Sequence, residues 1–334
     1  MSCLYVTEQG SKINSSEGKI IVECKNGMNR IVPRETLESI MIFGNVLMSI
    51  AAQKVCLEQG IKVTFLSTKG RYFGRLESTS HFNAERLKKQ VYLSDDEGKC
   101  LEFARKIQKA KIHNQLVVLK RYERNYYIDI KSEIDNIAVC ETKVSKSQDI
   151  NTLMGYEGMA AREYFQAISK LIKKEFSFTG RSRRPPKDAF NSMLSFGYTI
   201  AFYEIYAELE NRNLSPYIGF MHKIKEKHPT LVSDMLEEWR AVLVDSTVLS
   251  LIQGNEISIT EFTTDEETGG VQLSNNAIKL FVKKLENKMR MEMNYLEYLN
   301  SPVSFRRGLW HQVKALSSCV DSGDFGEYYP LRIR

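Results

Sequence analysis

The chain has 334 residues, of which 43% are hydrophobic and 26% are charged, and its formal net charge is +6. A chain of this length can bury a large core and favours about two domains, while so mild a positive charge is weak evidence for a nucleic-acid partner. No apolar run reaches the roughly 18 residues that span a bilayer, and no signal peptide is apparent, so we expect a cytoplasmic protein with no membrane partner. The six cysteines form no C-x-x-C pair and are expected to be free thiols.

The first eighty residues predict a small β-rich domain. Short apolar or alternating runs are separated by glycine-containing turns, and they lie at 4–7, 20–24, 30–32, 39–43, 62–66 and 72–76. One helix interrupts them, because apolar residues from Val46 to Leu57 share one helical arc and Gly60 follows as a stop signal. We therefore expect residues 1–80 to form a sheet domain that carries one helix.

Helical patterns dominate from Ala84 onward. After a predicted linker at 81–90, helices are expected at about 102–124, 131–146, 152–174, 188–209, 230–250, 273–298 and 305–320. A polar insertion near 263–270 is typical of a surface loop or a short hairpin. The predicted fold class is thus α+β, in which a small β-rich N-terminal domain precedes a larger all-helical domain at 91–334.

Three separated segments of the helical part carry residues that suit a hard metal ion. Glu157 falls inside the apolar arc of its helix, where an unpaired carboxylate is costly. His222 follows an apolar stretch that contains proline and glycine, while Asp234, Glu237 and Glu238 gather at i, i+3 and i+4 on the face opposite the apolar one. Carboxylates with one imidazole suit Mg²⁺ or Mn²⁺.

Each of these segments also has a plain structural interpretation. Glu157 is satisfied by backbone amides or by Arg162 if it is only a first-turn glutamate. His222 is a packed core residue in that interpretation, and the three acidic residues form the solvated side of an amphipathic helix. Taken singly, each segment is therefore a weak signal.

Two basic stretches favour a phosphate-rich partner. Seven Lys or Arg lie between Arg105 and Arg124 against one Glu, and seven more lie between Lys170 and Lys187 against Glu175 alone. The second stretch contains two consecutive prolines, which we expect to hold an extended loop with splayed basic groups as a phosphate clamp. The alternative is a solvated charged face. No P-loop, G-x-S-x-G elbow or H-E-x-x-H pair is present, which argues against nucleotide-driven motors and α/β-hydrolases.

The order of these segments resembles the CRISPR-associated spacer-acquisition integrase family, "Cas-one". The resemblance rests on GYEGMAAREYF at 155–165, RRPPKD with NSMLSFGY at 183–198, PYIGFMH at 216–222 and DMLEEWR at 234–240. Segments LYV at 4–6, FGN at 43–45 and VTFL at 63–66 look like the family's β-domain, so the resemblance covers nearly the whole chain.

The resemblance implies a metal site for Mg²⁺ or Mn²⁺ with Glu157, His222 and Glu237 as ligands. Asp234 falls where the family has a second important acidic residue, so the implied catalytic set is these four, without Glu238. His222 has to be neutral to ligate a metal, so activity is expected to fall as pH drops below its pKa. Five basic residues are expected to bind the DNA backbone: Arg162, Arg181, Arg183, Arg184 and Lys187.

The implied function is that of a metal-dependent DNA endonuclease and integrase, which inserts short DNA fragments into a CRISPR array by phosphodiester transesterification. The implied partners are double-stranded and branched DNA, a second copy of the chain, and the small protein "Cas-two" in a heterohexamer. The resemblance also implies that the β-rich domain at 1–80 contributes to the dimer. Two alternatives stay open from the residues alone: a scaffold that binds nucleic acid without turnover, and an RNA-processing nuclease with a similar metal site.

Overall fold

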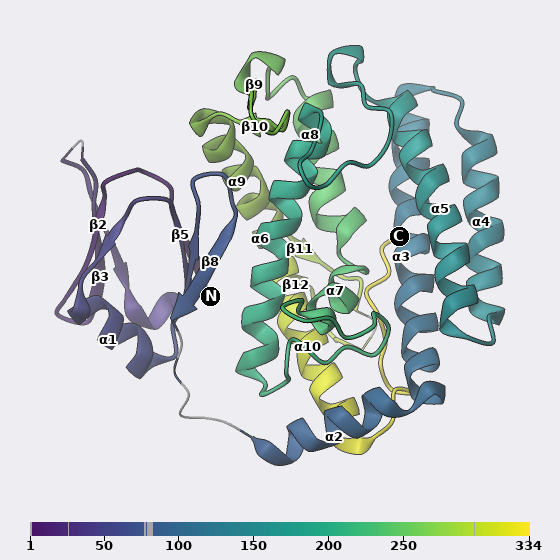
Figure 1. Cartoon of the computed structure of the whole chain (residues 1–334), viewed down its shortest axis with the longest axis horizontal. Helices are drawn as coiled ribbons and strands as arrows, with labels where there is room; N and C mark the ends of the chain where they lie inside the picture. Colours follow the sequence, from purple (N-terminus) through teal and green to yellow (C-terminus); the bar gives the residue numbers. More distant parts are fainter. Residues whose placement is uncertain (1, 26, 77, 79–82, 297) are drawn as a thin grey trace. The chain divides into compact units, whose positions relative to one another are not determined.

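The computed structural model describes residues 2–25, 27–76, 78, 83–296 and 298–334. The chain divides into two compact units, Met1–Phe82 and Asn83–Arg334, each with its own core (Figure 1). The first unit is built on β-sheets and the second is mostly helical, so the predicted α+β fold class is confirmed. No helix in the described part of the chain has both the length and the apolar character that a membrane crossing requires.

Two four-stranded sheets make up the described part of the first unit. One has the order β1-β5-β7-β8, with β1, β5 and β7 parallel, and the other has the order β4-β3-β2-β6. Their apolar residues, with Ile13, Ile40 and Val63 fully buried, pack in one core together with helix α1. The bounds are β1 Ser2–Val6, β2 Lys12–Ser16, β3 Lys19–Glu23, β4 Asn29–Pro33, β5 Leu37–Phe43, β6 Leu47–Met48, α1 Ile50–Gln59, β7 Lys62–Leu66 and β8 Tyr72–Leu76.

Two details of the first unit differ from expectation. Helix α1 begins at Ile50 rather than near residue 46, because the Ser49 side chain caps it by accepting from the Ala52 N–H and residues 47–48 pair with β2 as strand β6. Its end was predicted, and Gly60 caps it with a left-handed φ of 68°. Strand β2 was not predicted, since within its polar sequence Ile13 is the one fully buried apolar residue.

The second unit consists of helices around a long central one, α3, which lies beside α4 and α5 (Figure 1). It is not strictly all-helical, because two short two-stranded sheets occur among its described residues, and the first is the hairpin expected near 263–270. The bounds are α2 Ala84–Asp95, α3 Glu97–Tyr126, α4 Lys131–Lys146, α5 Ile150–Leu171, α6 Ala189–Asn211, α7 Thr230–Leu236, α8 Ser246–Gln253, β9 Phe262–Thr264, β10 Val271–Leu273, α9 Asn275–Arg290, β11 Glu292–Met293, β12 Val303–Ser304 and α10 Phe305–Ser322.

The predicted linker at 81–90 is helical over most of its length. Asn83 caps α2 by accepting from the Arg86 N–H, so residues 84–90 belong to that helix; residues 81 and 82 lie outside the described part of the chain. The buried Gln90 amide donates to the carbonyls of Ser215 (2.9 Å) and Ile218 (2.7 Å). Helix α2 is therefore packed onto the loop that leads to His222.

The helix expected at 230–250 is interrupted. Helix α7 ends at Leu236, a turn follows, and residues Arg240–Asp245 form a π-helical segment before α8 begins. A π-helical segment adds a residue to the turn and shifts every later side chain round the axis, so a constant 100° spacing assigns the wrong faces beyond Arg240. Every residue of α7 is buried, and Asp234, Glu237 and Glu238 are buried with it, so the alternative in which these three form a solvated side is wrong.

Candidate active site

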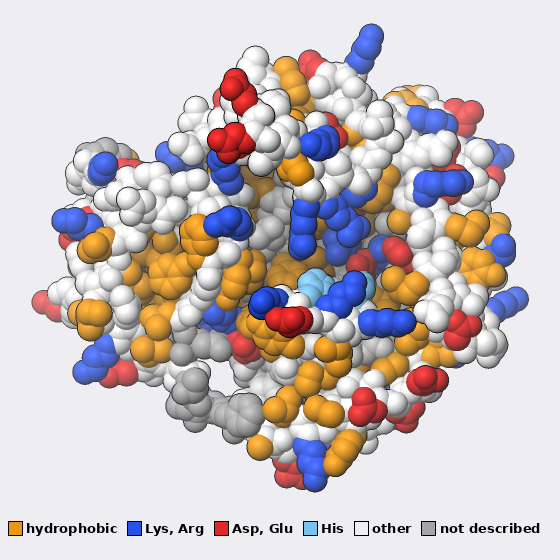
Figure 2. Space-filling view, viewed as in Figure 1, with side chains coloured by type: hydrophobic (Ala, Val, Ile, Leu, Met, Phe, Trp, Pro, Cys, Tyr) orange, Lys and Arg blue, Asp and Glu red, His pale blue; other side chains and the backbone are white. Residues whose placement is uncertain are grey.

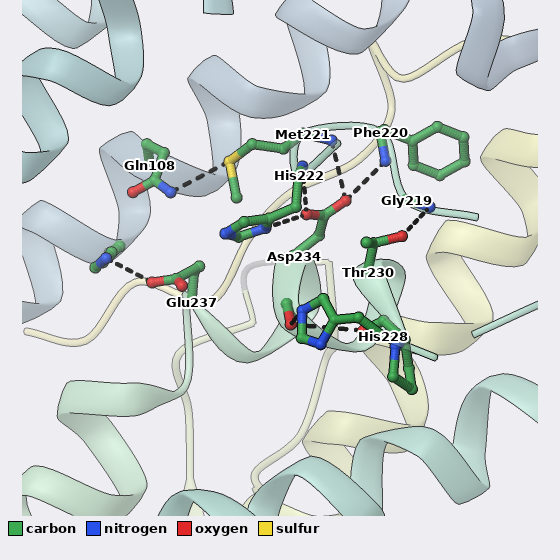
Figure 3. Close-up of polar contacts among 12 residues, drawn as sticks. Gln108, Gly219, Phe220, Met221, His222, His228, Thr230, Asp234 and Glu237 are labelled. Atoms are coloured by element: carbon green, nitrogen blue, oxygen red, sulfur yellow. Dashed lines mark hydrogen bonds and ion pairs between the residues drawn. The ribbon is translucent and has the colours of Figure 1, made fainter. Parts of the chain in front are cut away.

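Asp234 organises the loop that ends in His222. Its Oδ2 accepts the backbone N–H groups of Phe220 (2.7 Å) and Met221 (3.0 Å), and its Oδ1 accepts the backbone N–H of His222 (3.0 Å) (Figure 3). The side chain is fully buried, and four donors surround it once the His222 ring is included. The carboxylate therefore replaces the backbone pairing that a loop lacks.

The same carboxylate sets the orientation and tautomer of the imidazole. His222 Nδ1 lies 2.6 Å from Asp234 Oδ1, and since an ionised carboxylate only accepts, Nδ1 is the donor. Nε2 is then free to accept or to ligate, and Figure 3 shows the ring extending from Asp234 toward the side where Glu237 lies. Burial lowers the pKa of His222, but the hydrogen bond and charge of Asp234 outweigh it, so the pKa is raised overall.

Gly219 is required by the close approach of this loop to α7. A Cβ at this position would lie 2.7 Å from Asp234 Oδ2 and 3.0 Å from the backbone of Thr230. The Gly219 N–H donates to Thr230 Oγ1 (2.9 Å), whose hydroxyl donates to the Tyr217 carbonyl (2.6 Å). The sequence predicted that the proline- and glycine-containing segment before His222 presents this residue. In the structure, contacts of Gly219 with Thr230 and Asp234 of α7 hold the segment in place.

Glu157 and Glu237 meet at a single positive charge. The Lys111 ammonium, from the middle of α3, donates to Glu157 Oε1 of α5 and lies 2.5 Å from Glu237 Oε2 in the turn after α7. The side chains of Lys111 and Glu237 are only 8% and 7% exposed, and that of Glu157 only 14%. Two carboxylates about 80 residues apart in sequence therefore share one cation position, as a metal site requires.

Glu237 has a second basic partner. Arg240 Nε lies 3.2 Å from Glu237 Oε1, and its guanidinium stacks 4.6 Å from the centre of the Tyr198 ring. Burial raises the pKa of Glu237, but Arg240 and Lys111 outweigh it and hold the pKa well below its ordinary value. Glu237 is thus a carboxylate that stays ionised although it is buried.

Asp245 belongs to a buried polar network that includes Tyr198, the residue on which Arg240 stacks. Its two oxygens accept the hydroxyls of Tyr164 (2.9 Å) and Tyr198 (2.5 Å), which come from α5 and α6. Burial raises the pKa of Asp245 to about 6, against the opposing effects of both tyrosines and of Arg240. The π-helical segment therefore joins the helices that carry the site.

Glu238 has a separate role. Its carboxylate accepts from the Tyr328 hydroxyl (2.7 Å), the Gln312 amide (3.0 Å) and the Leu331 N–H (2.5 Å). Burial raises its pKa to about 7. Glu238 fixes the C-terminal segment, and the expectation of a three-carboxylate cluster on one face is wrong.

The basic residues differ in how far they are anchored. Arg183, Arg184 and Lys187 are exposed, although the Lys187 ammonium donates to the Thr268 carbonyl (3.2 Å), and Lys and Arg side chains gather around a hollow over α6 and α7 (Figure 2). Arg181 instead folds back, donating to the Ser182 carbonyl (2.7 Å) and Asn191 Oδ1 (2.6 Å) with its guanidinium over the Tyr198 ring. The expectation of splayed basic groups is therefore wrong for Arg181.

Arg162 does not contact Glu157. Its side chain is 81% exposed and lies 3.4 Å from Glu163, whereas Lys111 is the partner of Glu157. The alternative in which Arg162 satisfies Glu157 is therefore wrong.

The three predicted metal ligands are only partly brought together. Within the described residues, no three His, Cys, Asp or Glu side chains are grouped closely enough to hold a metal ion. Glu157 and Glu237 converge, but on Lys111, and His222 lies on the side of Glu237 without a bond to it among the described contacts. The ligand set remains a prediction.

Sequence reasoning missed Lys111, which it counted among the basic residues of a charged stretch. A signal was present, because Lys111 follows the buried Ile107 by four residues and precedes the buried Asn114 by three. A lysine on the apolar stripe of a helix needs a buried anion as partner. Arg240 and Asp245 gave no such signal, since the π-helical segment displaces them.

The comparisons with known proteins identify the family. The model of the family described as CRISPR associated protein Cas1 matches residues 4–287. This chain belongs to the Cas1 family. A CRISPR-associated endonuclease Cas1 from Mycobacterium tuberculosis is 32% identical over 96% of this chain and 94% of its own, and one from Thermus thermophilus is 30% identical over 99% and 97%.

Solved structures agree with the fold of this Cas1 chain. A Cas1 protein from Thermotoga maritima has a TM-score of 0.81 at 23% identity and covers 97% of this chain and 98% of its own. A casposase bound to its integration product has a TM-score of 0.84 at 21% identity and covers 100% and 96%. A chain of a Cas6-RT-Cas1–Cas2 complex has a TM-score of 0.83 at 25% identity, and this chain covers 36% of that longer chain. At such identities the likeness concerns the fold.

Proposed function

We propose that this Cas1 chain is a metal-dependent DNA endonuclease and integrase that inserts short DNA fragments into a CRISPR array by transesterification. Membership of a family whose relatives are called CRISPR-associated endonucleases supports the nuclease activity. The casposase with its integration product, which shares the fold, supports strand transfer. The observation that carries the proposal is the convergence of Glu157 and Glu237 on one buried cation position.

The residues at the site fit Mg²⁺ or Mn²⁺. Carboxylate oxygens are the ligands that these ions prefer, and two carboxylates, those of Glu157 and Glu237, already contact one positive charge. His222 presents a nitrogen that Asp234 leaves free. We propose Glu157, Glu237 and His222 as ligands, with Asp234 as the residue that positions His222.

When bound, the ion would polarise the scissile phosphate and stabilise the charge that develops on it. The other tasks belong to the chain. Asp234 holds the proton of the neutral His222 ring on Nδ1 and orients the ring, so that Nε2 is the nitrogen that can ligate, and Arg240 keeps Glu237 ionised and in place. The exposed Arg183, Arg184 and Lys187 are suited to hold the DNA backbone without reading its sequence.

The partners belong to the same proposal. One structural neighbour is a complex that contains Cas2, and another, with a TM-score of 0.53, is a Cas1–DNA complex. We propose that this chain forms a homodimer, that two dimers flank a central Cas2 dimer, and that the assembly holds double-stranded and branched DNA. Size measurement of the purified chain with and without Cas2 tests this stoichiometry.

The activity is tested with three single variants, Glu157→Ala, His222→Ala and Glu237→Ala. Each is expected to abolish Mn²⁺-dependent DNA cleavage and strand transfer while leaving DNA binding in place, because each removes a proposed ligand and no exposed basic group. Glu226→Ala is the matched control, since the Glu226 side chain is 86% exposed and pairs only with its neighbour Lys227 among the described contacts.

The outcomes separate the competing functions. Wild-type activity in any of the three variants would contradict the proposed ligand set. DNA binding without turnover, whether Mn²⁺ is added or chelated, would favour a scaffold. Cleavage of RNA but not of DNA, with both substrates in one assay, would favour an RNA-processing nuclease.

A further inference from the structure

Lys111 is the buried residue whose position the proposed activity leaves unexplained. Its side chain is 8% exposed, and its ammonium contacts carboxylates from two other segments, Glu157 on α5 and Glu237 after α7. A buried ion pair is costly unless it is well matched, and removal of one partner leaves an uncompensated buried charge. Lys111 therefore holds the two carboxylates together.

The charges at this point balance without a metal ion. Glu157 and Glu237 carry two negative charges, and Lys111 and Arg240 carry two positive ones. A divalent cation between the same oxygens would add two further positive charges at the place where the ammonium lies. Since ammonium and metal ion would repel each other in a buried site, they cannot share that position.

The two basic residues differ in how firmly they are held. Arg240 has a stacking partner in Tyr198, at 4.6 Å, and Asp245 contributes a further attractive charge behind it. The described contacts of the Lys111 side chain are with the two carboxylates alone, and a lysine side chain is a flexible four-carbon stem. Lys111 is therefore the residue that can move.

We propose that Lys111 is an internal counter-cation, which fills the position between Glu157 and Glu237 in the metal-free protein and gives it up when a divalent cation binds. The inference rests on the proposed metal site and adds a residue that competes with the metal. It has two consequences. Lys111 keeps the ligands close together before the metal arrives, and it weakens metal affinity, because its ion pairs must break first.

The test compares Lys111→Met with the wild type and with Lys109→Met, in the full chain without DNA. Lys109 is an exposed lysine on the same helix, so its variant makes the same change of charge outside the site. The measurements are Mn²⁺ binding by calorimetry, and thermal unfolding in chelator and in saturating Mn²⁺. Neither depends on catalytic activity.

In chelator, Lys111→Met is expected to unfold at a lower temperature than the wild type, because two buried carboxylates lose their shared partner. It should bind Mn²⁺ more tightly, about tenfold or more, which is the scale of one nearby charge in a buried site. Its unfolding temperature should therefore rise more on addition of Mn²⁺ than that of the wild type. Lys109→Met should match the wild type in each measurement.

Failure of this inference can be distinguished from failure of the proposed metal site. The metal site stands if the wild type binds Mn²⁺ and Glu157→Gln does not. If Lys111→Met then binds Mn²⁺ with wild-type or weaker affinity, the competition by Lys111 is overturned. If neither wild type nor Lys111→Met binds Mn²⁺, the proposed metal site fails and the inference fails with it. If Lys111→Met does not fold in chelator, Lys111→Gln replaces it, because the glutamine amide can donate to the carboxylates without carrying a charge. Tighter Mn²⁺ binding by Lys111→Gln than by the wild type would then support the inference, and wild-type or weaker binding would overturn it.

Discussion

At the scale of single residues, the site is defined by what each acidic group contacts. Asp234, Glu237 and Glu238 lie within five positions of one another, yet they contact a loop, two basic side chains and the C-terminal segment respectively. Sequence spacing cannot separate these roles, because it gives the direction of a side chain and not its partner. Among the candidate residues, Asp234 has the most complete set of donors.

Asp234→Asn is expected to destabilise the protein by about 2 kcal/mol or more, because an amide would turn its NH₂ group toward N–H donors that the carboxylate now accepts. The His222 ring should lose its fixed orientation as well. Urea unfolding measures the first effect. Asp135→Asn, at an exposed position on α4, is the control, and equal stability of the two variants would contradict the proposed anchoring.

At the scale of elements, the π-helical segment Arg240–Asp245 connects the site to the helical core. It presents Arg240 to Glu237 at one end and Asp245 to the tyrosines of α5 and α6 at the other. A regular helix at 230–250 could not orient both in this way, since the additional residue in the π-turn changes their relative direction. This segment explains why a constant helical period does not predict the directions of Arg240 and Asp245.

Asp245 gives this network a specific dependence on pH. Burial raises its pKa to about 6 from an ordinary value of 3.8, so between these values the folded protein holds a proton that the unfolded chain has lost. The free energy of unfolding therefore falls as pH rises from about 4 to about 6, and Asp245 contributes no further change above that. The size of the fall is on the order of 2–3 kcal/mol.

Asp245→Asn should remove this contribution, because an amide does not ionise. The measurement is urea unfolding of wild type and variant at several pH values from 4.5 to 7. The stability of the wild type relative to the variant is expected to decrease with rising pH over this range. A constant difference would show that Asp245 does not hold a proton in the folded state.

At the scale of the whole molecule, the net charge of +6 is the small difference between 47 basic and 41 acidic residues, so it does not show where basic side chains gather. On the face shown in Figure 2, several Lys and Arg side chains of the helical unit lie around a hollow over α6 and α7. Some of these charges serve the fold, as Arg181 and Arg240 do through their contacts with Tyr198. The exposed ones are the candidates for contact with DNA.

The triple variant Arg183→Ala, Arg184→Ala, Lys187→Ala should bind DNA more weakly at every sequence. The slope of log affinity against log salt should become shallower by about 0.9 for each phosphate contact that is lost. Fluorescence anisotropy at several salt concentrations measures both. Alanine at Lys131, Lys279 and Lys283, which are exposed elsewhere on the helical unit, is the control for net charge, and an equal effect of the two triple variants would argue against a phosphate-binding loop.

Much of this protein follows from its sequence alone. Strands β7 and β8 and helix α4 have the predicted bounds, because alternation and helical periodicity are local consequences of burying one face. The two-part α+β organisation and the family follow from the same local patterns and from motif order. The candidate residues Glu157, His222 and Glu237 were also identified from motif order and residue type, but the sequence does not give the distances between them.

The tertiary structure decided which of these side chains meet. Only the packing of α3 against α5 and the turn after α7 brings Lys111 between two carboxylates, and no spacing within one segment contains that contact. The π-helical segment also makes long-range contacts, since Asp245 accepts hydrogen bonds from tyrosines of α5 and α6 and Arg240 stacks on Tyr198 of α6. Local sequence fixes the direction of a side chain along its own element, but the partner of a buried charge is set by whichever element packs against it.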